Sequence, residues 1–236
     1  MNPITFFVAC LLALCGAVAA DTCYQDVSLD CSQVSNSLMG KRSLPNCNAV
    51  YAEYGHHGNV AKEMQAYAAL HLERSYEYLL SSSYFNNYQT NRAGFSKLFR
   101  KLSDDAWEKT IDLIKHITMR GDEMNFAQRS TQKSVDRKNY TVELHELESL
   151  AKALDTQKEL AERAFFIHRE ATRNSQHLHD PEVAQYLEEE FIEDHAKTIR
   201  NLAGHTTDLK RFVSGDNGQD LSLALYVFDE YLQKTV

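Results

Sequence analysis

The chain has 236 residues, with 33 acidic against 25 basic side chains and a formal net charge of −8. This charge argues against nucleic acid as a partner and makes cations acceptable ones. The length allows one large domain or two small ones with a well-developed core.

The N-terminus reads as a segment to be removed. Residues 4–20 are almost continuously apolar and end in the small residues of Gly16–Ala20. An apolar stretch before such a site is typical of a signal peptide, which predicts cleavage near Ala19 or Ala20. No Lys or Arg precedes the stretch. A membrane anchor is the alternative, although the stretch is at the short limit for spanning. We expect no membrane association and a mature chain in the secretory pathway or outside the cell.

Three cysteines remain after this cleavage, and all precede the first predicted helix. Cys23, Cys31 and Cys47 lie in a loop-like stretch, residues 21–57, rich in Ser, Asn, Asp and Gly. An odd number of thiols in an exported protein suggests one internal disulfide and one bond to another chain. A free or capped thiol is the alternative. Spacing does not rank the internal pairings firmly; our choice is Cys23 with Cys47, which leaves Cys31 for the interchain bond.

Helices are predicted along the rest of the chain. No proline occurs between Pro45 and Pro181, and apolar residues recur at helical intervals. The pattern predicts helices over residues 60–79 and 95–117, the second closing at Gly121, and a third over 147–168. Asp180 and Pro181 form an N-cap signal for a fourth helix to about residue 212, and a short fifth covers about 221–232.

The connections between these helices indicate the topology. They are short, long and short, and the long one covers residues 121–142. Four long helices with one long crossover predict an all-α, ferritin-like four-helix bundle over residues 58–236, with the short fifth helix at its C-terminus. A cytokine-like bundle, which has two long crossovers, and a lipid-binding bundle are the alternatives.

Several short motifs resemble the ferritin family, in the expected order between about residues 58 and 233. They are Ser75-Tyr76-Glu77-Tyr78-Leu79 through Tyr84-Phe85, Met119-Arg120-Gly121-Asp122, Asp180-Pro181, Leu202-Ala203-Gly204-His205-Thr206-Thr207-Asp208-Leu209 and Tyr226-Val227-Phe228-Asp229. The signal peptide, the cysteine-bearing extension and the longer loops resemble the secreted ferritins of insects, specifically their light-chain subunit.

A catalytic ferritin oxidises Fe(II) at a di-iron centre, which needs carboxylates and an imidazole projecting from facing helices. The usual pattern, Glu-x-x-His, occurs once, from Glu53 to His56, in the loop before the first helix. An exposed polar loop is its simpler interpretation. The sequence pattern therefore offers no di-iron centre within the helices.

The resemblance indicates the same, position by position. The positions that match the ferroxidase ligands and their neighbours hold His71, Asp105, Ala106, Lys109, Gln157 and His195, and only the accompanying tyrosine is kept, as Tyr78. An ammonium at Lys109 would repel Fe(II). We expect Lys109 to pair with Asp105 instead, and we expect no enzymatic activity. His71 and His195 could together hold zinc, but buried, hydrogen-bonded histidines are commoner.

Three further expectations come from the resemblance. The helix positions that match the mineral-nucleating glutamates of vertebrate light chains hold Lys97, Arg100, Lys101 and Asp104, so nucleation there is not implied. The acidic channel positions on the three-fold axes match Gln185 and Glu188, with His168 facing them from the third helix. The fifth helix, through Leu223, Tyr226, Val227 and Tyr231, would line the four-fold channel as an apolar plug or simply pack on the bundle.

These observations predict an iron-storage subunit without its own ferroxidase centre. It would form a 24-subunit shell with a catalytic, heavy-type partner, joined to it by a disulfide, around a ferric mineral. The sequon Asn139-Tyr140-Thr141 predicts a glycan on the long connection. A secreted helical carrier or signalling protein, and a ferritin subunit with weak ferroxidase activity, are the alternatives.

Overall fold

The structure, a computed structural model, describes residues 23, 25, 27, 47, 48, 58–126, 145–173, 179–214 and 221–236. Residues 1–50 and 51–236 form two separate units. In the first unit a disulfide joins Cys23 to Cys47, with a Cα–Cα distance of 4.5 Å. This is the internal pairing chosen from the sequence. Cys31 lies outside the described residues, as do the Glu53–His56 motif and Asn139.

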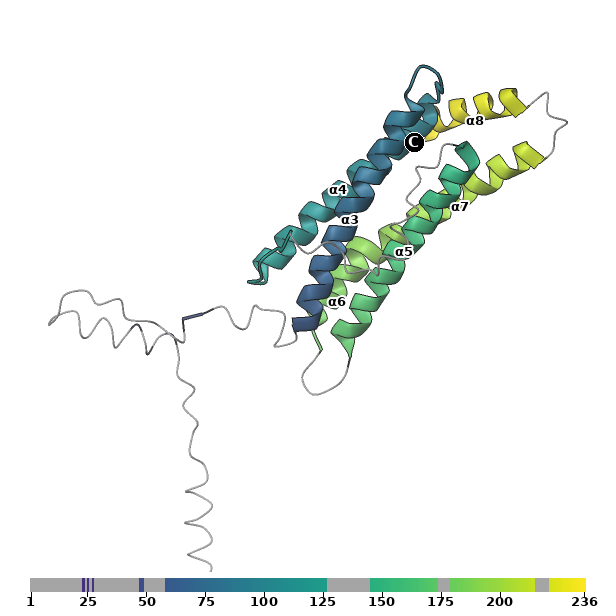
Figure 1. The fold of residues 1–236 in the computed structure, drawn as a ribbon. Helices are drawn as coiled ribbons and strands as arrows, with labels where there is room; N and C mark the ends of the chain where they lie inside the picture. The colour runs from purple at the N-terminus through teal and green to yellow at the C-terminus, as the bar shows by residue number, and fades with distance from the viewer. Residues whose placement is uncertain are drawn as a thin grey trace, which may run out of the picture. The chain divides into compact units, whose positions relative to one another are not determined.

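The second unit is built from helices, and its described parts contain no strand. The helices are α3 (Gly58–Phe85), α4 (Ala93–Met119), α5 (Glu146–Thr172), α6 (Pro181–Leu187), the π-helix η2 (Glu188–Ile192), α7 (Glu193–Ser214) and α8 (Leu221–Thr235) (Figure 1). The predicted all-α class is confirmed. No helix in the described ranges is long and apolar enough to cross a membrane.

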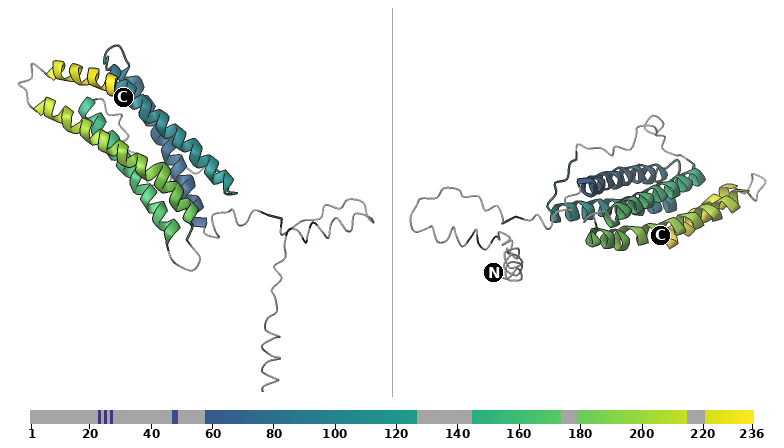
Figure 2. Two further views of the ribbon diagram at one scale, coloured as in Figure 1. Left: turned by 180° about the vertical axis from the view of Figure 1, so that it is seen from behind. Right: turned by 90° about the horizontal axis from the view of Figure 1, so that it is seen from below.

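The long helices pack in two pairs. Helix α3 lies along α4, and α5 lies along α6, η2 and α7 (Figures 1 and 2). Helix α8 contacts α4 and α7 at one end of the bundle. Residues 86–92 join the first pair, whereas the connection from α4 to α5 spans residues 120–145. The predicted bundle with one long connection and a short fifth helix is therefore present.

The helix ends follow the local signals in the sequence. Gly121 takes a φ of 82°, the left-handed conformation that commonly ends a helix. The Asp180 carboxylate accepts a hydrogen bond from the Val183 amide at 3.2 Å and so caps α6. Arg120, just after α4, lies 2.6 Å from the same carboxylate. This ion pair fixes the end of α4 to the start of α6.

The predicted fourth helix differs in one respect. It is not a uniform α-helix, because residues 188–192 form a π-turn between α6 and α7. A π-turn adds one residue to a helical turn and rotates the residues after it, and such turns often mark functional sites. The apolar spacing contained no signal for it, since Leu187 and Phe191 are both buried and four residues apart, as in an ordinary α-helix.

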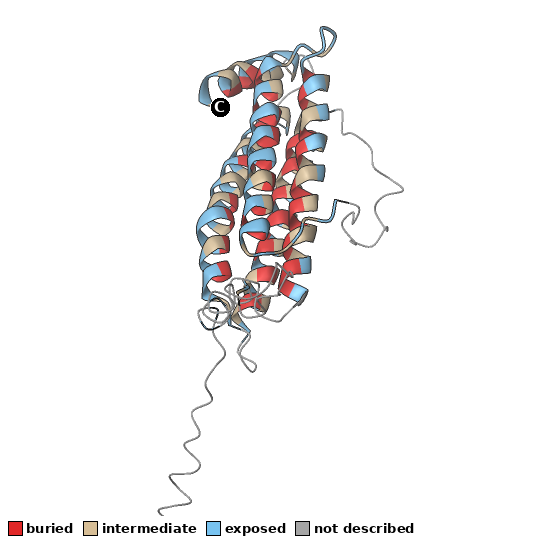
Figure 3. Ribbon diagram, turned by 90° about the vertical axis from the view of Figure 1, so that its left-hand side faces the viewer, coloured by how far each residue is buried: buried red, intermediate tan, exposed pale blue. Residues whose placement is uncertain are grey.

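The core consists of two apolar clusters with a polar layer between them. One cluster contains Met64, Leu113, Leu160 and Phe191, and the other contains Phe85, Phe99, Leu150 and Leu209. The buried faces of the helices turn toward one another (Figure 3). At mid-length each helix of the bundle contributes buried polar side chains: His71, Ser75, Ser103, Thr110, Gln157 and His195. This layer is where the candidate site lies.

Candidate metal centre

The structure brings together most of the positions that the resemblance matched to a di-iron centre. His71 and Tyr78 come from α3, Gln157 from α5 and His195 from α7, and all four are buried. Ala106 of α4 is buried as well. Each of these residues follows the buried apolar residues of its own helix at helical spacing, so it lies on the face that the helix turns toward the core. The positions therefore belong to one interior layer, but their chemistry has changed.

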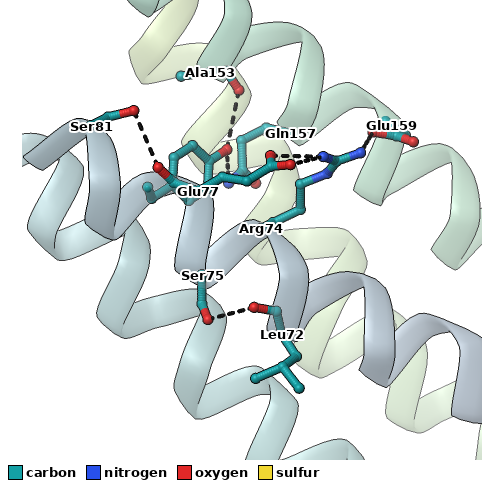
Figure 4. Close-up of polar contacts among 9 residues, drawn as sticks. Leu72, Arg74, Ser75, Glu77, Ser81, Ala153, Gln157 and Glu159 are labelled. Atoms are coloured by element: carbon teal, nitrogen blue, oxygen red, sulfur yellow. Dashed lines mark hydrogen bonds and ion pairs between the residues drawn. The ribbon is translucent and has the colours of Figure 1, made fainter. Parts of the chain in front are cut away.

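A chain of hydrogen bonds links the polar side chains of this layer. Tyr67 Oη lies 2.9 Å from His195 Nε2, and His195 Nδ1 lies 2.9 Å from Gln157 Oε1. The Gln157 amide nitrogen donates to Tyr78 Oη at 3.2 Å, and the Tyr78 hydroxyl donates to the Ala153 carbonyl at 3.4 Å. Figure 4 labels Gln157 and Ala153 at the two ends of these bonds. An amide oxygen only accepts, so His195 Nδ1 carries the proton and Nε2 accepts from Tyr67. With His195 neutral and protonated on Nδ1, every hydrogen bond from Tyr67 to the Ala153 carbonyl has one donor and one acceptor.

His71 stands beside this chain without joining it. Its ring stacks on that of His195 at a centroid distance of 5.6 Å and meets the Tyr67 ring edge-on at 4.5 Å. Neither ring nitrogen has a hydrogen-bond partner among the described residues. Burial lowers the pKa of His71, and the neighbouring His195 and Lys109 lower it further. Burial and Lys109 likewise lower the pKa of His195 to about 4.

Lys109 extends from α4 toward the π-turn. Its ammonium lies 2.7 Å from Asp194 Oδ2, donates to the Glu190 carbonyl and stands 5.1 Å above the centre of the Phe191 ring. The prediction that Lys109 forms an ion pair with Asp105 is therefore wrong. Asp105 is exposed on α4, whereas the facing segment offers Lys109 a carboxylate, a carbonyl and an aromatic face together.

These residues do not fit a di-iron centre. Ala106 has no ligand atom, and His195 and Gln157 use the atoms that could bind a metal to bind each other and Tyr67. Lys109 supplies a positive charge at the edge of the layer. Within the described ranges, no group of three or more His, Cys, Asp or Glu side chains is placed to hold a metal ion. A zinc site at His71 and His195 finds no third ligand among the described residues of this layer.

The predicted channel residues lie elsewhere, at the junction of α5 with the π-turn. His168 Nε2 lies 2.7 Å from Glu188 Oε1, so the structure brings these two together. Gln185 instead donates to Glu189 at 2.9 Å. The π-turn thus carries the consecutive carboxylates of residues 188–190, all exposed. A channel on this surface stays a prediction.

Sequence reasoning missed four contributors to the layer. Tyr67 lies four residues before His71, on the same helix face, so helical spacing could have found it. Glu190, Phe191 and Asp194 become partners of Lys109 through the π-turn and the packing of α4 near α7. No local sequence pattern predicts the π-turn or the packing of α4 near α7. Three of the four missed residues are thus defined by tertiary contacts.

Comparison with known proteins gives the family. A model of the ferritin-like domain matches residues 61–212. The chain is 75% identical to a ferritin light chain of Trichoplusia ni over 100% of both chains, and 41% identical to one of Drosophila melanogaster over 97% of this chain and 99% of the other. The crystal structure of Trichoplusia ni secreted ferritin superposes with a TM-score of 0.80 at 78% identity, covering 92% of this chain and 100% of that one. The chain belongs to the ferritin family.

Proposed function

We propose that this chain is the light-type subunit of a secreted iron-storage ferritin and has no ferroxidase centre of its own. Residues 1–20 would be its signal peptide, residues 21–57 a disulfide-bearing extension, and residues 58–236 the bundle that joins a 24-subunit shell. The relatives support this proposal, since two are named as ferritin light chains and one as a secreted ferritin.

The observation that carries the proposal is the polar layer. In place of metal ligands, this layer holds uncharged side chains joined by hydrogen bonds, from Tyr67 through His195 and Gln157 to Tyr78. Binding Fe(II) there would require breaking buried hydrogen bonds, and a buried group left without its partner costs about 1–3 kcal/mol. The Lys109 ammonium adds repulsion toward any cation that enters.

In such a shell not every subunit has to oxidise iron. A heavy-type partner would oxidise Fe(II), and the ferric product would mineralise in the shared cavity, where iron is cargo rather than a cofactor of this chain. Cys31 would link the two chain types, and Asn139 would carry a glycan on the outer surface. This subunit would then supply shell wall and partner contacts.

Co-expression with a heavy-type subunit tests the proposal. We expect both chains to elute together at hundreds of kilodaltons and to take up iron, whereas this chain alone takes up iron slowly. A carrier or signalling protein would instead elute as a small oligomer whether or not the partner is present. Elution of this chain as a small species, separate from the partner, would overturn the proposal.

A further inference from the structure

The structure contains a pocket outside the polar layer, at the α8 end of the α3–α4 pair. It has a volume of about 640 Å³. Its walls are the last two turns of α3, the first three turns of α4 and the end of α8: Leu79, Ser82, Ser83, Asn86, Ala93, Ser96, Lys97, Arg100, Lys101, Asp104 and Val236. The storage function proposed above does not use this pocket.

The charge of the pocket is opposite to that of the chain. The whole chain carries a net charge of −8, yet Lys97, Arg100 and Lys101 line the pocket against a single side-chain carboxylate, Asp104. Their positions repeat at helical spacing, so they form one face of α4. A locally positive surface on an acidic protein concentrates anions rather than cations.

Much of the hydrogen-bonding capacity of these cations is unused. Arg100 contacts both oxygens of Asp104 through Nε alone, at 3.0 Å, so its two terminal nitrogens are without a partner among the described residues. Lys97 donates to the Gln233 carbonyl at 2.9 Å, which uses one of its three protons. Lys101 makes no hydrogen bond to a described residue, although its charge acts on the carboxylate of Asp105 on the same helix.

Neutral donors surround the charges. Three serine hydroxyls, of Ser82, Ser83 and Ser96, and the amide of Asn86 line the same pocket. The Ser82 hydroxyl donates to the Ser96 carbonyl at 2.9 Å, whereas Ser83 is exposed. Arginine, lysine and hydroxyl donors together suit a tetrahedral oxyanion, which accepts several charge-assisted hydrogen bonds at once. A metal cation would find a single side-chain carboxylate in this lining, and that carboxylate is already paired with Arg100.

We infer that this pocket binds inorganic phosphate, with Lys97, Arg100 and Lys101 supplying the charge and Ser83 a hydroxyl donor. On the positions that the resemblance matches to the acidic nucleation surface of vertebrate light chains, this chain presents an anion site. If the storage role holds, phosphate bound there would be available to precipitate with ferric iron. Phosphate binding itself does not depend on that role.

The test is equilibrium binding of inorganic phosphate to the iron-free, full-length protein at constant ionic strength and neutral pH, followed by calorimetry. We expect saturable binding of one phosphate per chain. The double variant Arg100→Gln/Lys101→Gln should weaken it roughly tenfold or more, since each cation contributes charge-assisted hydrogen bonds. The control, Lys115→Gln/Lys158→Gln, removes the same charge from exposed sites outside the pocket and should leave the affinity unchanged.

A second variant keeps the test decisive if the double variant misfolds. Ser83→Asp changes one exposed side chain and places a negative charge in the pocket, so it should abolish phosphate binding while the circular dichroism spectrum stays unchanged. Absence of saturable binding by the unmodified chain would overturn the inference. Equal weakening in the pocket variant and the Lys115/Lys158 control would also overturn it, because it would show general attraction of anions rather than a site.

Discussion

The carboxylate of Asp229, in α8, caps the start of α4 at Gly94. Asp229 Oδ1 accepts hydrogen bonds from the Gly94 amide at 2.9 Å and from the Phe95 amide at 3.1 Å. Arg92, at the N-cap position itself, makes no side-chain cap. An added Cβ at Gly94 would overlap the Asp229 carbonyl oxygen. The fifth helix therefore docks by satisfying backbone donors that α4 leaves open.

Replacing either member of this contact should loosen α8. Asp229→Ala leaves two buried amides without an acceptor and should lower the free energy of unfolding by about 1–3 kcal/mol. Gly94→Ala forces the helices apart and should cost a similar amount, whereas Asp229→Asn, which keeps an acceptor oxygen, should cost less. Urea unfolding followed through Trp107, the only tryptophan, gives these values. Equal stability of Asp229→Ala and the unmodified chain would disprove the capping role.

The Asp229 contact illustrates how much of the fold could be predicted from the sequence. Gly121 and the Asp180-Pro181 pair end and begin helices as predicted, because capping depends on residues within one turn. The Tyr226–Asp229 motif is visible in the sequence, but its partner lies 134 residues away, and only packing reveals it. The π-turn and the partners of Lys109 are hidden from the sequence for the same reason. The positions of the polar layer came from resemblance, whereas its hydrogen bonds came from the structure.

Lys109 should stabilise the junction between α4 and the π-turn. Lys109→Met keeps the length of the side chain but removes the ion pair with Asp194, the hydrogen bond to the Glu190 carbonyl and the cation–π contact. We expect a loss of about 1–2 kcal/mol in unfolding free energy. Lys115→Met is the matched control: Lys115 is exposed and pairs only with Asp112 on its own helix, so its loss should cost under about 0.5 kcal/mol. Similar losses in the two variants would contradict a special role for Lys109.

The buried histidines predict a loss of stability in acid. Folding lowers the pKa of His195 from 6.5 to about 4. Between these two pH values, His195 is protonated in the unfolded chain and neutral in the folded chain. Stability should therefore fall as the pH drops from about 6.5 to about 4, by roughly 2 kcal/mol between pH 7 and 5 from this residue. His71 acts in the same direction.

His195→Gln provides the comparison, because glutamine keeps hydrogen-bonding atoms but does not titrate in this range. The difference in unfolding free energy between pH 7 and pH 5 should shrink in this variant. His179→Gln, at an exposed histidine, should leave the difference as it is. A pH dependence identical in His195→Gln and the unmodified chain would rule out His195 as its source.

The cysteines predict a covalent heterodimer. With Cys23 and Cys47 joined to each other, Cys31 remains for a partner chain. Non-reducing electrophoresis of the co-expressed subunits should show a heterodimer band that reduction abolishes and that Cys31→Ser removes without loss of helical content. Closing the loop from Cys23 to Cys47 is worth about 3 kcal/mol in the chain-entropy model, but it orders the extension only. A non-reduced sample running entirely as monomer would contradict the interchain bond.

The initial rate of Fe(II) oxidation in air decides whether this chain holds a ferroxidase centre. The purified chain should oxidise Fe(II) no faster than buffer, because Ala106, Lys109 and the His195–Gln157 pair leave no ligand set among the described residues. The variant His71→Glu/Ala106→Glu/Lys109→His/Gln157→Glu restores carboxylates and an imidazole to one layer and should oxidise Fe(II) measurably faster than buffer. Rapid oxidation by the unmodified chain would contradict the account.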